Sequence, residues 1–207
     1  MILPLIAMVT AVLCAQLRWR VAAAWLLAII SVLGAVLTLK VCFYACGWLV
    51  PAFDPDALAL RSPSGHAASA AAAYGGIAAL VAARTRLGAV PMALAAAVGM
   101  AALIGTTRIA LGAHSVAEVV VAASIGIVGA VAFAGLAGRQ AAERSGLPVL
   151  AGALIVVAVF HGRHLPAEGI IQRIMAETLR QWVTACRPSG GQDRLRANHA
   201  PTPTHSA

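Results

Sequence analysis

Residues 115–138 read SVAEVVVAASIGIVGAVAFAGLAG and hold a single ionisable side chain, Glu118. A helix needs about 17–25 predominantly apolar residues to cross the hydrocarbon core of a bilayer, so this run predicts a membrane span. Further apolar runs lie on both sides of it and are separated by shorter, more polar segments. In total we predict six spans, at about residues 1–17, 21–46, 66–83, 87–106, 115–138 and 145–160.

The amino-acid composition argues against a soluble protein. The chain has 207 residues, of which 61% are hydrophobic and 11% are charged, whereas a soluble domain has about 45–50% and about 25%. About one domain's worth of chain cannot enclose so much apolar surface. We therefore expect an all-α polytopic membrane bundle, in which abundant alanine and glycine let the helices pack closely.

Three segments are expected along the chain. Residues 1–160 are expected to form the six-helix transmembrane domain. The first apolar run is counted as a span because no positive residue precedes it, as one would in a signal peptide. In 161–187, apolar residues recur at helical spacing with charged residues between them, which predicts an amphipathic surface helix. The polar residues 188–207 are expected to be disordered.

The positive charges indicate an orientation. The net charge of +8 is spread over loops and tail, so no nucleic-acid-binding face is expected. Short loops rich in Lys and Arg favour the cytoplasm. One side of the bundle has six such residues and the other has three, so we expect the second side to face the periplasm of a bacterial inner membrane. The six are Arg18, Arg20, Arg84, Arg86, Arg139 and Arg144, and the three are Lys40, Arg61 and Arg108.

Five ionisable residues are expected at that outer side, where the predicted helix ends meet: Lys40, His66, Arg108, His114 and Glu118. Such groups are costly at membrane depth and by default mark functional sites. The start of the third span, at 63–66, offers unpaired N–H groups to an anion. His114 and Glu118 are four residues apart, so they share a helix face, and the carboxylate would fix the imidazole tautomer. With Arg108 and Lys40 as phosphate-binding cations, these groups suit phosphoryl transfer.

Two of these motifs resemble those of a known family. Ser62-Pro63-Ser64-Gly65-His66 and Thr107-Arg108-(five)-His114-(three)-Glu118 are similar to the second and third motifs of the type 2 phosphatidic acid phosphatase superfamily. The family pattern is KxxxxxxRP, then PSGH, then SRxxxxxHxxxD. The motifs cover about residues 40–118, and the layout of the spans extends the resemblance to about residue 160.

The resemblance implies hydrolysis of a lipid phosphate or pyrophosphate at the outer face of the bilayer, with no metal or cofactor. His114 would form a phosphohistidine, Glu118 would orient it, and His66 would protonate the leaving oxygen and later activate water. The phosphoryl oxygens would be bound by Lys40, Arg108 and the backbone of Ser64 and Gly65.

The sequence departs from the family pattern at three places. Thr107 replaces serine and keeps the hydroxyl, and Glu118 replaces aspartate and adds one methylene. Counting from Lys40, Gly47-Trp48 stands where Arg-Pro is expected, and Arg61 is the candidate to supply the missing cation. These departures keep a second hypothesis open, a catalytically weak or inactive relative that binds or transports anionic lipids.

Other polar groups receive ordinary interpretations. Cys42 and Cys46 lie in an apolar run and favour core packing over a redox pair. His161 and His164 form a weak candidate for a metal pair, and surface histidines explain them better. The loop at 54–56 contains two aspartates that are expected to be solvated. We therefore predict no metal site.

Overall fold

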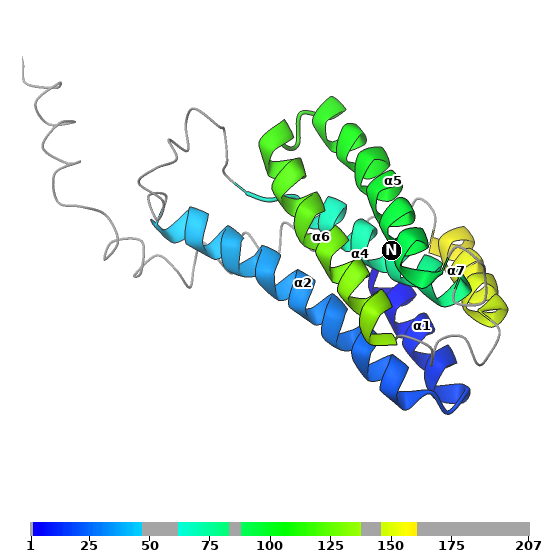
Figure 1. Cartoon of the computed structure of the whole chain (residues 1–207). Helices are drawn as coiled ribbons and strands as arrows, with labels where there is room; N and C mark the ends of the chain where they lie inside the picture. Colours follow the sequence, from blue (N-terminus) through cyan, green and yellow to red (C-terminus); the bar gives the residue numbers. More distant parts are fainter. Residues whose placement is uncertain (1, 47–61, 83–87, 138–145, 161–207) are drawn as a thin grey trace, which may run out of the picture.

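The computed structural model describes residues 2–46, 62–82, 88–137 and 146–160, which form six helices and no strand (Figure 1). Four of these helices are long and apolar enough to cross a membrane, so this is an integral membrane protein. The other two, at the ends of the described chain, are apolar but have only 14 residues each. The prediction of an all-α membrane bundle is confirmed, and the count of six spans stays a prediction. The helices are α1 (Ile2–Ala15), α2 (Trp19–Cys46), α4 (Gly65–Ala82), α5 (Ala89–Ala110), α6 (Val116–Ala137) and α7 (Leu147–Phe160).

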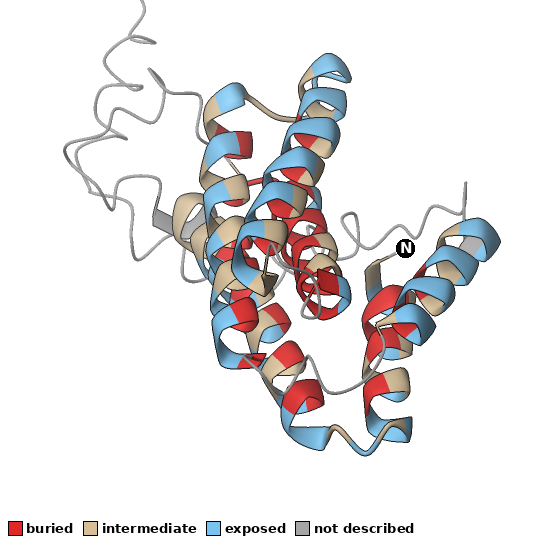
Figure 2. Cartoon of the chain, turned by 45° about the vertical axis from the view of Figure 1, so that its right-hand side comes forward, coloured by how far each residue is buried: buried red, intermediate tan, exposed pale blue. Residues whose placement is uncertain are grey.

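Helix α4 is the centre of the bundle. It packs closely against α5, α6 and α2, and more lightly against α7 and α1. Thirteen of its 18 residues are buried, and ten of these are alanine or glycine. Figure 2 shows the buried positions gathered on α4 and on the sides of the neighbouring helices that face it. Small side chains allow this central position because they let the backbones approach closely.

A very close helix approach joins α4 to α6. A Cβ atom built on Gly126 would lie 2.3 Å from the carbonyl oxygen of Ala68 and 2.8 Å from the Cβ of Ala71. Real Cβ atoms do not come so near to a backbone oxygen, so only glycine fits at this crossing. Ala68 lies one turn into α4, and the crossing therefore holds the first part of α4 against α6.

The outward faces of the helices carry large apolar side chains. Leu27 and Ile30 on α2, Leu103 on α5 and Val128 on α6 are all more than half exposed in the isolated chain. In water such a surface would be unfavourable. Lipid tails are as apolar as these side chains, so the pattern is that of a bundle whose solvent is the bilayer.

Two helix hairpins set the ends of the bundle. The α1–α2 turn closes through Leu17, which has a φ of 57°, and the Arg18 N–H donates to the Leu13 carbonyl at 2.9 Å. The α5–α6 turn lies at the other end, on the same side as the start of α4 and the C-terminal end of α2 (Figure 1). The structure thus brings together the helix ends that carry the predicted site residues.

Several predictions fall on residues that the structure does not describe. Arg61, the loop with Gly47-Trp48 and the two aspartates, the predicted surface helix at 161–187 and the predicted tail at 188–207 all lie outside the described residues. The division of the chain into three segments stays a prediction.

Candidate active site

The first turn of α4 begins at a serine cap. The hydroxyl of Ser64 accepts the N–H of Ala67 at 3.4 Å, and the Ser64 carbonyl accepts the N–H of Ala68 at 3.2 Å. Ser64 is therefore the N-cap of α4 and is fully buried. Gly65 and His66 are the first two residues of the helix, and their amides are among those that have no acceptor within the helix.

A tight turn brings the other motif back to the same end. Gly112, with a φ of 64°, occupies the left-handed position that ends a helix. The N–H of Ala113 donates to the carbonyl of Arg108 at 3.0 Å, and that of Gly112 to the carbonyl of Ile109 at 2.9 Å. Because this turn reverses the chain within a few residues, Arg108 at the end of α5 and His114 before α6 lie at one corner of the bundle.

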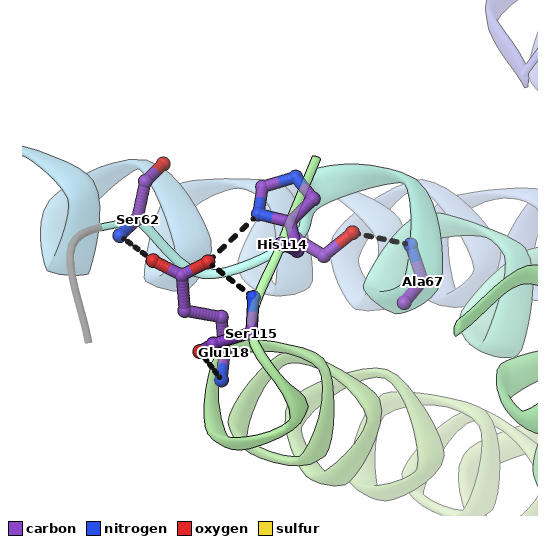
Figure 3. A network of polar contacts seen from close by, with 6 residues as sticks. Ser62, Ala67, His114, Ser115 and Glu118 are labelled. Carbon is purple, nitrogen blue, oxygen red and sulfur yellow. Dashed lines mark hydrogen bonds and ion pairs between the residues drawn. The ribbon is translucent and has the colours of Figure 1, made fainter. Parts of the chain in front are cut away.

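His114 precedes α6 and does not lie within it. The helix starts at Val116 and Ser115 is its N-cap, since the Ser115 hydroxyl accepts the N–H of Glu118 at 3.2 Å. The Glu118 side chain turns back, and its Oε2 accepts the N–H of Ser115 at 3.1 Å. This reciprocal pair is a capping box, drawn in Figure 3. The expected contact of His114 with Glu118 is therefore present, but it arises from this fold-back and not from a shared helix face.

The carboxylate of Glu118 contacts several parts of the site. Its Oε2 also lies 3.1 Å from the Nδ1 of His114, while its Oε1 accepts the backbone N–H of Ser62. The Glu118 backbone carbonyl in turn accepts the N–H of Ser64 at 3.4 Å. The glutamate is buried, at 4% exposure. One residue thus joins the α5–α6 turn to the start of α4.

These contacts define the tautomer of the neutral imidazole. Both oxygens of Glu118 accept backbone N–H groups, so the carboxylate acts as an acceptor and Nδ1 of His114 must donate to it. The Nε2 atom then carries the lone pair, and in Figure 3 this second nitrogen points away from Glu118. The His114 side chain is only 7% exposed. The result is an oriented imidazole with its basic nitrogen directed away from the carboxylate.

For the other predicted site residues, the structure gives the helix position and the exposure. His66, in the first turn of α4, is exposed, whereas Arg108 in the last turn of α5 and Lys40 on α2 are half-buried. Lys40 lies six residues before the end of α2, at the same end of the bundle. The structure thus joins the 62–66 motif to the 107–118 motif through direct hydrogen bonds, and the helix positions of Lys40, His66 and Arg108 lie at the same end of the bundle.

Two participating residues were not foreseen from the sequence. Ser115 caps α6 and donates to Glu118, and its spacing from a glutamate three residues later is a readable capping-box signal. The N–H of Ser62 is bonded across a separation of 56 residues. No local pattern could have indicated that second contact.

The fold and the site together define a class: a polytopic helical membrane protein with an imidazole–carboxylate pair at the start of one helix and a PSGH segment bonded to it. The family model of the PAP2 superfamily matches residues 43–142, a segment that includes both motifs. The match confirms the resemblance of this segment to the PAP2 superfamily. None of the curated proteins and none of the solved structures compared with the chain matches it significantly.

Proposed function

We propose that this protein is a membrane phosphatase that hydrolyses a lipid phosphate or pyrophosphate through a phosphohistidine intermediate. PAP2 superfamily members are phosphatases that act on phosphate esters, and the match to this family is the general support. The observation that carries the proposal is the contact of His114 with Glu118, because it leaves Nε2 as a directed nucleophile next to the PSGH segment.

The proposed reaction has two steps. The Nε2 of His114 attacks phosphorus, the bond from phosphorus to the leaving oxygen breaks, and His66 gives that oxygen a proton. Water then attacks the phosphorus of the phosphohistidine and passes a proton to His66. The bond from phosphorus to Nε2 breaks, inorganic phosphate is released, and both histidines return to their starting states. Proton transfer of this kind contributes about 10²–10⁴-fold to a rate.

The phosphoryl oxygens are assigned to donors at the same end of the bundle. Arg108 offers a planar fork and Lys40 a point charge. Among the backbone groups, the N–H of Ser64 already donates to Glu118, so the amide of Gly65 is the better candidate. Arg61 stays the candidate for the cation that is missing from the first motif.

The substrate class and the location follow from the setting. The helices have apolar outer faces, so a substrate with a hydrocarbon tail can reach the site from the bilayer while its headgroup stays at the water boundary. The distribution of Lys and Arg over the short loops supports a location of this boundary in the periplasm of a bacterial inner membrane. No metal ion takes part in the proposed steps.

The test is phosphate release from several lipid phosphates and pyrophosphates by the purified full chain in detergent, with EDTA present. We expect turnover by the wild type, and a loss of at least about 10³-fold in His114→Ala, because the nucleophile is removed. Ser124→Ala is the control, since this exposed α6 hydroxyl donates only locally, to the Val120 carbonyl at 2.9 Å.

Two results would count against the proposal. Turnover that is equal in the wild type and in His114→Ala would exclude the phosphohistidine. Lipid binding without any turnover, unchanged when both His66 and His114 are replaced, would favour the alternative of an inactive relative that binds or transports anionic lipids.

A further inference from the structure

Glu118 makes more contacts than the orientation of His114 requires. One carboxylate oxygen serves His114 and the α6 cap, and the other accepts the N–H of Ser62. The Glu118 carbonyl adds the N–H of Ser64. Pro63, between these two serines, has no N–H to donate, so the described contacts of Glu118 take up both backbone donors of the Ser62–Ser64 segment.

The Ser62–Ser64 segment leads directly into α4. Ser64 caps that helix, and His66 follows two residues later. A shift of the segment would therefore move the Gly65 amide and the His66 side chain with it. The Gly126 crossing lies one to two turns further along, at Ala68 and Ala71, so it holds the turns that follow while Glu118 holds the start of the helix.

The length of the glutamate arm matters for this arrangement. An aspartate at position 118 would withdraw the carboxylate by about 1.5 Å, the length of one carbon–carbon bond. N–H···O hydrogen bonds are typically about 2.7–3.2 Å long, so we expect the shorter arm to lose its partners on one side. The methylene that sets this chain apart from the family pattern is what lets one carboxylate span the two segments.

We propose that Glu118 is a positioning residue for the start of α4 as well as for His114. Its carboxylate holds the Ser62–Ser64 segment, and so sets the place of His66 and the Gly65 amide relative to the imidazole of His114. As far as the reaction is concerned, this inference rests on the proposed function. It predicts that Glu118→Asp, which restores the family residue, impairs the enzyme.

The first experiment needs no activity. Hydrogen–deuterium exchange of the purified full chain follows the amides in peptides that cover 62–67. We expect exchange to be about tenfold faster or more in Glu118→Asp, the size of effect that a lost hydrogen bond to a charged group implies, with no change in peptides from the middle of α5. Unchanged exchange at 62–67 would overturn the proposal.

A matched pair of variants at Ser62 tests the same hydrogen bond by changing its donor. Ser62→Pro removes the N–H that donates to Glu118 and leaves the carboxylate and His114 in place, whereas Ser62→Ala keeps the N–H. We expect faster exchange at 64–67 in Ser62→Pro and wild-type exchange in Ser62→Ala. Equal exchange in the two variants would contradict the proposal, even if Glu118→Asp failed to fold.

The second experiment separates the two positioning roles by kinetics. An alkyl phosphate and an aryl phosphate with the same hydrocarbon chain differ in how much the leaving oxygen needs a proton, which His66 would supply. If Glu118 also places His66, kcat/KM of Glu118→Asp falls at least about tenfold more on the alkyl ester than on the aryl ester. His66→Ala should show the same preference. An equal loss on both esters would confine Glu118 to orienting His114.

The outcomes keep this proposal apart from the proposed function. A wild type without phosphatase activity refutes the proposed function, and the exchange experiments still decide whether Glu118 holds the start of α4. An active wild type whose exchange at 62–67 does not depend on Glu118 refutes the positioning role alone.

Discussion

Arg108 and Thr107 are adjacent in the sequence but differ in their burial and in the contacts that they make. The hydroxyl of Thr107 donates to the Ile104 carbonyl of its own helix at 2.7 Å, and the residue is exposed. The replacement of the family's serine by threonine therefore leaves the described hydroxyl contact within α5. Arg108 is half-buried at the same helix end, and its carbonyl anchors the turn that leads to His114.

This difference predicts that a conservative substitution lowers activity at Arg108 and leaves it nearly unchanged at Thr107. Arg108→Lys keeps the charge but loses the planar fork, so we expect kcat/KM for phosphate release to fall about tenfold or more. Thr107→Ser, the control, should stay within about twofold, because an exposed substitution changes free energies by about 0.5 kcal/mol or less. Steady-state kinetics on one lipid phosphate measures both. An Arg108→Lys enzyme with wild-type kcat/KM would remove Arg108 from the phosphate-binding set.

At the level of helices, the crossing of α4 and α6 depends on one missing side chain. Gly126 faces the Ala68 carbonyl so closely that a methyl group has no room. Gly135, on the same helix, has no heavy atom within 4 Å of a built Cβ. Two glycines of one helix thus differ in what they do: the first permits a contact and the second faces outward.

Gly126→Ala is therefore expected to destabilise the bundle, and Gly135→Ala is not. Overpacking of this kind costs about 1–3 kcal/mol, and each kcal/mol lowers the melting temperature of a chain of this size by about 2–4 °C. Thermal unfolding of the two variants in detergent provides the comparison. Equal melting temperatures would show that α4 and α6 do not cross as described. Because the crossing adjoins the first turn of α4, Gly126→Ala should also reduce phosphate release.

At the level of the whole molecule, the two ends of the bundle differ in chemistry. One end has the α1–α2 turn, where the Arg20 guanidinium lies 5.3 Å from the centre of the Trp19 ring, a pairing suited to a membrane interface. The other end has the α5–α6 turn, the start of α4 and the proposed site. The bundle therefore presents its catalytic candidates to one side of the membrane.

This polarity can be tested with cysteine labelling of intact cells. Leu17 in the α1–α2 turn and Leu111 in the α5–α6 turn are both strongly exposed, at 81% and 74%. In a background without the native cysteines, Leu111→Cys should react with a reagent that does not cross the inner membrane. Leu17→Cys should react only after the cells are opened. The reverse result would turn the site toward the cytoplasm, and labelling of both from outside would contradict the spans.

Much of the fold was predictable because hydrophobic length is a local property. The runs at 21–46, 66–83, 87–106 and 115–138 predicted α2, α4, α5 and α6 to within four residues at each end. The end runs gave helices shorter than predicted, at Ile2–Ala15 and Leu147–Phe160. Helix ends depend on caps, and Ser64, Gly112 and Ser115 set them here.

The sequence alone determined the membrane setting, the two motifs and their meeting at one end of the bundle, since apolar run lengths and residue spacings decide these. It also contained the capping-box spacing from Ser115 to Glu118. Only the tertiary structure decided that the Glu118 carboxylate reaches Ser62. That contact needs α4 and α6 to cross at the distance that Gly126 permits, and such a distance arises from the packing of remote side chains, which no local pattern encodes.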